Sequence, residues 1–324
     1  MTVLVTGGAG YIGSHMVHAL VDAGERVVVL DNLTTGFDWA VPKGVWLVVG
    51  ETGDRPRVAA LIAEHRVDAV IHFAASIVVP DSVRDPLGYY RNNTVNSHAL
   101  IETLVKAGVR HFIFSSTAAV YGNPERVPVR EDDPTMPTSP YGSPKLMTEI
   151  MLRDAGAAHG LRHVILRYFN VAGADPLGRT GQSTRGATHL IKVAVETALA
   201  LRPKMEVFGT DYPTPDGTCI RDYIHVSDLV AAHSDALAYL RSGDAQLRVW
   251  PWLFRARRDR NREARLRRRL QGRDRGPAAG RSGPHRRGRR PYPVHAQLAA
   301  AFRRSANHRQ ARAGRGAQAT TPPS

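Results

Sequence analysis

The stretch Thr2-Val3-Leu4-Val5-Thr6-Gly7-Gly8-Ala9-Gly10-Tyr11-Ile12-Gly13 decides the fold of this chain. Its β-branched run predicts a strand, and three glycines spaced by three residues follow that strand directly. In such a loop the first glycine allows a tight turn, the second lets the backbone approach a pyrophosphate, and the third lets helix and strand pack closely. The helix that opens after the loop would meet the negative charge with its N-terminus. The stretch therefore predicts a dinucleotide site; a glycine-rich turn without a ligand is the alternative.

Short β-branched runs alternate with helical patterns through the first 120 residues. Strands are expected at residues 3–5, 27–30, 69–73 and 111–115, and helices at residues 15–23, 57–65 and 97–107. A further helix continues through residues 147–159, and residues 163–168 are expected to form the next strand. This alternation is typical of βαβ units with right-handed connections, which build a doubly wound parallel sheet. The predicted fold class is therefore α/β, with a Rossmann sheet.

An acidic residue closes the second expected strand. Asp31 comes about 20 residues after the glycines, where a carboxylate can accept hydrogen bonds from both ribose hydroxyls of a dinucleotide. The same carboxylate would repel a 2′-phosphate, which favours NAD over NADP. The alternative is an aspartate that only initiates a turn before Asn32.

Tyr141 and Lys145 are four residues apart, so a helix projects both from one face. The ammonium can then lower the pKa of the phenol, which would let Tyr141 act as a base near neutral pH. Ser115-Ser116-Thr117 follows an expected strand, at the edge where a parallel sheet exposes ligand sites. A hydroxyl there can hydrogen-bond the substrate oxygen that Tyr141 deprotonates. A solvated helix pair and a helix cap are the alternatives, but with the glycine loop upstream the pattern indicates nicotinamide redox chemistry.

The positive charge of the chain is confined to its C-terminal end. The 324 residues carry a formal net charge of +15, yet residues 246–324 alone hold 22 arginines, no lysine and three acidic residues, a net of +19. Residues 1–245 are therefore left with −4. The single cysteine, Cys219, excludes an internal disulfide and fits a reducing cytoplasm. No signal peptide, and no run near the ~20 apolar residues of a membrane span, is recognisable, so a cytoplasmic protein without a membrane partner is expected.

The chain resembles the UDP-glucose 4-epimerase group of the extended short-chain dehydrogenase/reductase family. The resemblance covers nearly all of residues 1–240 and is carried by TGGAGYIGSH, LDNL, HFAAS, YYRNN, FSSTAAVYG, SPYGSPK, LRYFNVAGA and FGTDYPTPDGTCIRDYIHVSDL. The last two stretches are the specific ones, because the glycine loop and Tyr-x-x-x-Lys are shared by the sugar-nucleotide enzymes of this family. The resemblance implies NAD as cofactor, a UDP-sugar as substrate, a homodimer, and no metal.

The resemblance also implies a role for each matching position. Tyr141 would be the base, Thr117 its hydroxyl partner, and Lys145 the group that tunes Tyr141 and holds the nicotinamide ribose. The implied cofactor-binding residues, besides Tyr141 and Lys145, are Gly7, Gly10, Tyr11, Ile12, Gly13, Asp31, Asn32, Phe73, Ala74, Asn92, Ser115 and Tyr168. The implied substrate-binding residues are Thr117, Asn170, Tyr212 and Arg221.

The implied reaction is a round trip of hydride that interconverts UDP-glucose and UDP-galactose. Tyr141 would remove the proton of the sugar 4-hydroxyl while C4 gives its hydride to NAD⁺, and the 4-keto sugar would turn over before the hydride returns to its opposite face. A 4,6-dehydratase or decarboxylase of the same family is the alternative enzyme; a dehydratase would want an acid pair beside Thr117, where Ala118 and Ala119 stand. Two further positions depart from the family pattern, Glu51 in place of an aspartate and Ile77 in place of a lysine of some relatives.

After about residue 245 the family pattern stops. The family continues with Asn-Cys-Gly and then with Arg-Arg-Pro-Gly-Asp, whose arginine clamps the diphosphate, and the chain has neither. Residues 247–257 can be back-translated so that reading one base later gives Cys-Gly-Tyr-Gly-His-Gly-Tyr-Ser-Val-Leu. Residues 263–276, 277–287 and 290–304 permit the same treatment in the same shifted frame, so we hypothesise a frameshift between about Leu240 and Leu247. A genuine disordered arginine-rich tail and a nucleic-acid-binding extension are the alternatives; the lack of lysine and of a binding module argues against the extension.

Three regions are therefore expected. Residues 1–170 form the NAD-binding Rossmann domain, residues 171–245 form a smaller and incomplete substrate-binding part, and residues 246–324 form an out-of-frame-like tail without a fold. A chain that retains NAD binding without turnover, or one whose basic tail binds a polyanion, stays open as an alternative to an active epimerase.

Overall fold

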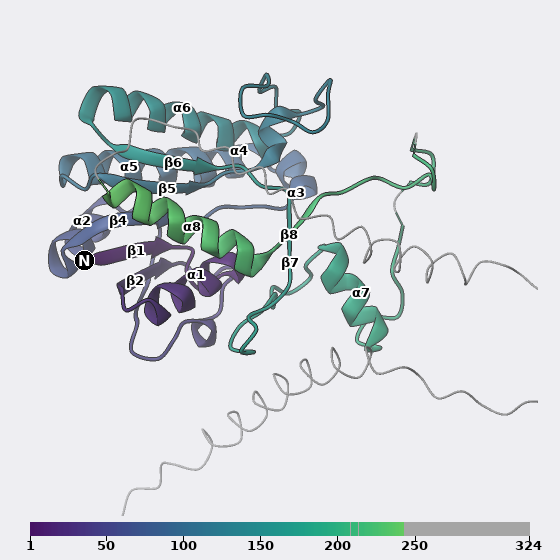
Figure 1. Cartoon of the computed structure of the whole chain (residues 1–324), viewed down its shortest axis with the longest axis horizontal. Helices are drawn as coiled ribbons and strands as arrows, with labels where there is room; N and C mark the ends of the chain where they lie inside the picture. Colours follow the sequence, from purple (N-terminus) through teal and green to yellow (C-terminus); the bar gives the residue numbers. More distant parts are fainter. Residues whose placement is uncertain (208, 213, 243–324) are drawn as a thin grey trace, which may run out of the picture. The chain divides into compact units, whose positions relative to one another are not determined.

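The computed structural model describes residues 1–207, 209–212 and 214–242 (Figure 1). The expected tail at residues 246–324 lies outside these residues. The described part begins with the predicted strand and glycine loop.

Six parallel strands form the central sheet, in the order β3-β2-β1-β4-β5-β6. They are β1 (Thr2–Thr6), β2 (Arg26–Asp31), β3 (Trp46–Val49), β4 (Val67–His72), β5 (His111–Ser115) and β6 (Arg162–Leu166). The order reverses between β1 and β4, where Thr6 pairs with Leu30 on one side and with His72 on the other. In open α/β sheets ligands bind outside the carboxyl ends of the strands at such a switch point. The predicted Rossmann fold is confirmed.

Helices cover both faces of the sheet. The longer ones are α1 (Tyr11–Asp22), α2 (Arg55–His65), α5 (Asn96–Lys106), α6 (Gly142–His159) and α8 (Val226–Arg241). Side chains alternate along each strand, so Val3 and Val5 of β1 pack with α1 and α8, while Leu4 packs on the other side with α2, α5 and α6. Each fully buried Val, Leu or Ile contributes about 1.5–3 kcal/mol through removal of its surface from water.

Helix α8 comes from the segment that the sequence analysis assigned to the substrate part, yet it packs on the Rossmann sheet. Figure 1 shows it, in green, running beside α1 across the sheet. Leu229, Val230, Ala236, Leu237 and Leu240 are buried there, at spacings that form one apolar face of a helix. The chain therefore leaves the Rossmann layers after β6 and returns to them at residue 226.

The remaining elements lie around the carboxyl edge of the sheet or beyond it. They are the 3-10 helices η1 (Asp38–Ala40) and η3 (Ala118–Tyr121), the helices α3 (Val79–Arg84), α4 (Pro86–Tyr90) and α7 (Leu190–Ala198), the π-helix η2 (Arg91–Val95), and the strands β7 (Asn170–Ala172) and β8 (Tyr223–His225). Strands β7 and β8 form a separate parallel pair in which Asn170 lies beside Tyr223. No residue of α7 is buried. Among the described helices, none has the length and apolar content that crossing a bilayer requires.

Candidate active site

The glycine loop is closed on one side and open on the other. Gly7 has φ +70°, and a Cβ there would lie 2.6 Å from the amide nitrogen of Ala74. A Cβ on Gly13 would lie 2.1 Å from the carbonyl oxygen of Gly7. At Gly10, by contrast, a Cβ would meet only that carbonyl oxygen, at 3.2 Å, and no side chain caps the helix α1 that begins at Tyr11. The open side at Gly10, facing uncapped helix amides, fits the diphosphate of a dinucleotide.

Asp31 at the end of β2 holds this loop in place. Its carboxylate accepts hydrogen bonds from the amides of Ala9 (2.9 Å) and Leu33 (2.8 Å). Burial raises the pKa of Asp31, and the two backbone hydrogen bonds oppose that rise. The bond to Leu33 is the turn that the sequence analysis gave as an alternative. Each carboxylate oxygen keeps a lone pair, so the turn does not prevent contact with ribose hydroxyls. The neighbouring Asn32 donates its amide to Glu51 (3.0 Å).

The loop after β4 lies against the glycine loop and is fixed by the π-helix η2. Asn92 donates to the Ser76 hydroxyl (2.9 Å), and Asn93 exchanges two hydrogen bonds of 2.8 Å with the Ser76 backbone. At the start of the loop the amide of Phe73 donates to the Thr6 carbonyl (3.0 Å). Sequence reasoning found Asn92 and missed the fully buried Asn93; the adjacent pair of asparagines was the available signal. π-helical turns of this kind are frequent at functional sites.

Thr117, Tyr141 and Lys145 meet at the carboxyl edge of the sheet. Tyr141 caps α6 and has a helical backbone, so Lys145 lies one turn further along. The Thr117 side chain accepts from the Ala119 amide (3.1 Å) and lies close enough to the Tyr141 phenol to lower its pKa. The Lys145 ammonium is buried and donates to the Ser115 carbonyl (2.8 Å), with the ring of Phe114 4.8 Å away.

The pKa values in this group differ from the expected tuning. Burial raises the pKa of Tyr141, and the Thr117 hydroxyl opposes that rise. The Lys145 ammonium donates to the Ser115 carbonyl. Burial lowers the pKa of Lys145 to about 8, against the charge of Glu149. Thr117 therefore favours the Tyr141 phenolate.

A buried ion pair behind these residues was not predicted from the sequence. Glu149 is fully buried and receives two donor groups of Arg167, with Nε 3.0 Å from Oε1. It also accepts a 2.5 Å hydrogen bond from the Ser116 hydroxyl. Arg167 in turn donates to the Tyr121 hydroxyl (2.8 Å). The pair ties residues 116–121 to α6, which fixes Thr117 relative to Tyr141. Its only visible signal was the position of Glu149, four residues after Lys145.

Two of the expected substrate-binding residues, Asn170 and Arg221, lie at or next to the β7 and β8 pair. The Asn170 amide donates to the Asp222 carbonyl (3.1 Å), which places it next to Arg221, an exposed cation. Tyr212 is 44 % exposed and belongs to a turn closed by its own amide and the Gly217 carbonyl (3.1 Å). The structure thus holds Asn170 against Asp222, the residue after Arg221, and shows Tyr212 on a separate exposed turn.

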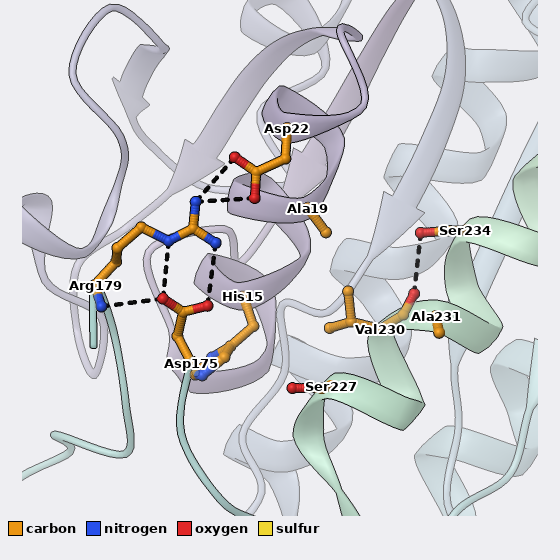
Figure 2. Close-up of a pocket in the computed structure, with 9 residues that line it drawn as sticks. All are labelled: His15, Ala19, Asp22, Asp175, Arg179, Ser227, Val230, Ala231 and Ser234. Atoms are coloured by element: carbon orange, nitrogen blue, oxygen red, sulfur yellow. Dashed lines mark hydrogen bonds and ion pairs between the residues drawn. The ribbon is translucent and has the colours of Figure 1, made fainter. Parts of the chain in front are cut away.

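A shallow pocket of about 200 Å³ lies away from these residues (Figure 2). It is lined by His15, Ala19, Asp22, Asp175, Arg179, Ser227, Val230, Ala231 and Ser234. Figure 2 shows Arg179 between Asp22 of α1 and Asp175 of the segment after β7. None of the sequence-predicted site residues lines it. The Tyr11 hydroxyl also donates to the Gly173 carbonyl (2.7 Å). These contacts therefore fix the segment after β7 to α1, the helix that follows the glycine loop.

Comparison with known proteins agrees with this geometry. Residues 3–249 match the profile of a family described as the NAD dependent epimerase/dehydratase family. A UDP-glucose 4-epimerase of Azospirillum brasilense is 64 % identical over 245 residues, which cover 76 % of this chain and 70 % of that protein. A UDP-glucose 4-epimerase of Halalkalibacterium halodurans is 48 % identical over 241 residues, 74 % of this chain and 72 % of that one. The structure of UDP-glucose 4-epimerase from Brucella ovis in complex with NAD is similar, with a TM-score of 0.72 and 46 % identity over 74 % of this chain and 73 % of that one. The chain belongs to the NAD-dependent epimerase/dehydratase family.

Proposed function

We propose that this chain carries the site for NAD-dependent interconversion of UDP-glucose and UDP-galactose. The observation that carries the proposal is the meeting of Thr117, Tyr141 and Lys145 beside a glycine loop that is open only at Gly10, in a chain 64 % identical to an epimerase. The single cysteine supports a cytoplasmic setting.

Each residue then has a defined task. Tyr141 takes the proton of the sugar 4-hydroxyl and gives it back on the return step, and Thr117 stabilises the phenolate with its hydroxyl hydrogen. Lys145, whose pKa of about 8 lies near neutrality, holds the nicotinamide ribose. NAD⁺, when bound, supplies the hydride acceptor. Asn170 and Arg221 bind the UDP part, where the Arg221 guanidinium suits a diphosphate, and Tyr212 lies near the uridine.

The proposed cofactor contacts follow the elements that hold them. The glycine loop takes the diphosphate, Asp31 and Asn32 take the adenosine ribose, and the remaining positions surround the nicotinamide half. Those of the loop are Gly7, Gly10, Tyr11, Ile12 and Gly13, and those of the nicotinamide half are Phe73, Ala74, Asn92, Ser115, Tyr141, Lys145 and Tyr168.

A coupled assay of UDP-galactose conversion tests the proposal. Tyr141→Phe should abolish turnover, and Thr117→Val should lower it by about tenfold or more through loss of one hydrogen bond to the reacting phenol. Tyr90→Phe, in a half-buried tyrosine outside the site, is the matched control and should retain the wild-type rate. Activity that survives Tyr141→Phe would contradict the assignment.

NAD binding without turnover is the second candidate, and the tail is the reason for it. The match to the Azospirillum brasilense protein leaves 30 % of that protein unmatched, while the family profile ends at residue 249 of this chain. We propose that residues 246–324 are the product of a frameshift and that the substrate-binding part at residues 171–245 is therefore incomplete. Sequencing the coding DNA around residues 240–247 tests this: one intact frame in independent reads contradicts it. A chain with the restored frame should convert UDP-galactose faster than the present one.

A homodimer is the proposed assembly. Exposed apolar side chains gather where η2 packs on α4 and α6: Leu87 is 78 % exposed, Val95 55 %, and Ile150 46 %. Apolar residues in one region of this kind mark protein interfaces. Light scattering of Ile150→Glu should show a shift toward monomer, whereas Leu177→Glu, at an equally exposed apolar position elsewhere, should not. A wild-type monomer at high concentration would contradict the proposal.

A further inference from the structure

One histidine that the proposed reaction does not use lies beneath the dinucleotide site. His233 belongs to α8, and its side chain is completely buried. The centroid of its ring lies 4.9 Å from that of Phe73 and 6.4 Å from that of Tyr168. In the sequence it is a lone histidine on an apolar helix, where the usual role is to fill a core. Its hydrogen bonds indicate a more specific one.

Each ring nitrogen of His233 has one partner. Nδ1 lies 2.8 Å from the Leu229 carbonyl oxygen, and Nε2 lies 2.9 Å from the Ser115 hydroxyl. Burial lowers the pKa of His233 to about 4, so the ring is neutral near pH 7 and carries a single N–H. A carbonyl oxygen can only accept a hydrogen bond, which requires the hydrogen on Nδ1 and leaves a lone pair on Nε2.

This tautomer sets the direction of the next hydrogen bond. The Ser115 hydroxyl must donate to Nε2, because Nε2 has no hydrogen of its own. A directed chain runs from the Ser115 hydroxyl through His233 to the Leu229 carbonyl.

The same serine holds the catalytic lysine. Its carbonyl accepts the Lys145 ammonium at 2.8 Å, and its hydroxyl is bonded to His233. One residue at the end of β5 therefore joins Lys145 of α6 to His233 of α8, beside the rings of Phe73 and Tyr168.

We propose that His233 is a positioning residue for the nicotinamide half of the NAD site: by accepting from the Ser115 hydroxyl it fixes, beside the rings of Phe73 and Tyr168, the residue whose carbonyl holds Lys145. The inference rests on the proposed function, because it takes NAD to be the molecule beside Phe73 and Tyr168. It adds a residue of α8, the helix that returns to the Rossmann layers after the substrate part.

Three variants of the full chain test the role. His233→Leu removes the acceptor that orients Ser115, while His233→Gln retains an amide oxygen that can accept from the same hydroxyl. The matched control is His163→Leu, since His163 is 5 % exposed, lies on β6 and has a single bond, to the Leu161 carbonyl. The measurements are the Kd for NAD⁺ by titration and the Tm. His233→Leu should raise the Kd about tenfold, the scale of one lost buried hydrogen bond with its unsatisfied partner. His233→Gln should recover most of the affinity, and His163→Leu should lower the Tm without changing the Kd.

The proposal is overturned if His233→Leu and His163→Leu have the same Kd for NAD⁺. The route through Ser115 is overturned if His233→Leu still costs tenfold in a Ser115→Ala background, where we expect less than about twofold. Should His233→Leu fail to fold, long-range ¹⁵N spectra of histidine-labelled wild type decide: protonated Nδ1 with bare Nε2 supports the chain of hydrogen bonds, and protonated Nε2 overturns it. A wild-type chain that binds no NAD⁺ would count against the proposed function instead, and the tautomer measurement would still test the orientation of Ser115.

Discussion

Gly13→Ala is expected to force α1 away from the glycine loop. A Cβ at this position would lie 2.1 Å from the Gly7 carbonyl oxygen and 2.8 Å from the Gly8 Cα, where real Cβ contacts essentially never fall below 3.0 Å. The loop therefore has to move by roughly 1 Å relative to the helix. It cannot do so freely, because the Gly7 amide donates to the Leu30 carbonyl (2.9 Å) and Gly8 packs on Val29.

The size of the effect follows from what must be displaced. Overpacking a close-packed interior costs about 1–3 kcal/mol when side chains can adjust. Here the opposing atoms belong to the backbone, so we expect the upper end, about 3 kcal/mol. In a domain of this size each kcal/mol lowers the Tm by about 2–4 °C, which gives a decrease of roughly 6–12 °C.

Gly10→Ala is the matched control, because its backbone suits any residue. Gly10 has φ −78° and ψ 179°, and its Cβ would have only one contact, at 3.2 Å. We expect its Tm to fall by less than about 2 °C, while its Kd for NAD⁺ rises because the methyl group enters the space facing the diphosphate. Circular dichroism melts and NAD⁺ titrations measure both. The reasoning is refuted if Gly13→Ala melts like the wild type, or if Gly10→Ala loses as much Tm as Gly13→Ala.

Three further predictions concern buried charges. The Lys145 pKa falls from 10.5 to about 8 on folding, so between these pH values the unfolded chain binds more protons than the folded chain. The free energy of unfolding should therefore rise by about 3 kcal/mol across this pH range. Urea melts at each pH should show no such rise for Lys145→Met, and an equal slope in variant and wild type would contradict the assignment. Burial lowers the pKa of His72 from 6.5 to about 3, so the stability that the neutral His72 contributes is lost as the pH falls below 6.5, by about 1.4 kcal/mol at pH 5.5. The stability of His72→Gln should depend less on pH in this acidic range. Parallel stability curves of wild type and variant would disprove this prediction. Glu149→Ala should lower the free energy of unfolding by about 3–5 kcal/mol, because it leaves the Arg167 guanidinium buried without a partner. The double variant Glu149→Ala with Arg167→Met should recover part of that loss. A double variant less stable than the single one would contradict this prediction.

The sheet could be predicted because most of its strands have a recognisable local sequence pattern. The expected strands and helices of the first 170 residues all occur, with ends that differ by a few residues. Strand β3 was missed because its four residues are all apolar and show no alternation of polar and apolar side chains. It lies at the edge of the sheet, where Trp46 is 65 % exposed and Val49 is 51 % exposed.

The partners of buried polar groups could not be predicted. Glu149 pairs with Arg167, 18 residues away, and His233 bonds to Ser115, 118 residues away. Local spacing reveals only neighbours on the same helix, such as Lys145 and Glu149. The position of α8 could not be predicted for the same reason. Its apolar face is visible in the sequence, but the layer that covers this face depends on where the chain returns after β8. The acceptor of Lys145 could not be predicted either, because it is the backbone carbonyl of Ser115 on β5, 30 residues away.

The path of the chain also determines which part of the site depends on the segment after residue 242. The residues proposed for the cofactor, and His233, which bonds to Ser115, all precede the end of α8 at Arg241. A chain truncated after Ser242 should therefore bind NAD⁺ with a Kd within about threefold of the full chain, less than the tenfold that one lost hydrogen bond produces. The substrate side differs, because no residue of α7 is buried and Leu190 and Ile191 are 49 % and 45 % exposed. The truncated chain should bind a hydrophobic dye at this surface, and Leu190→Lys should reduce that signal without affecting NAD⁺. Loss of NAD⁺ binding on truncation would show that residues beyond 242 complete the cofactor site, and would contradict the assignment of that site to the described residues.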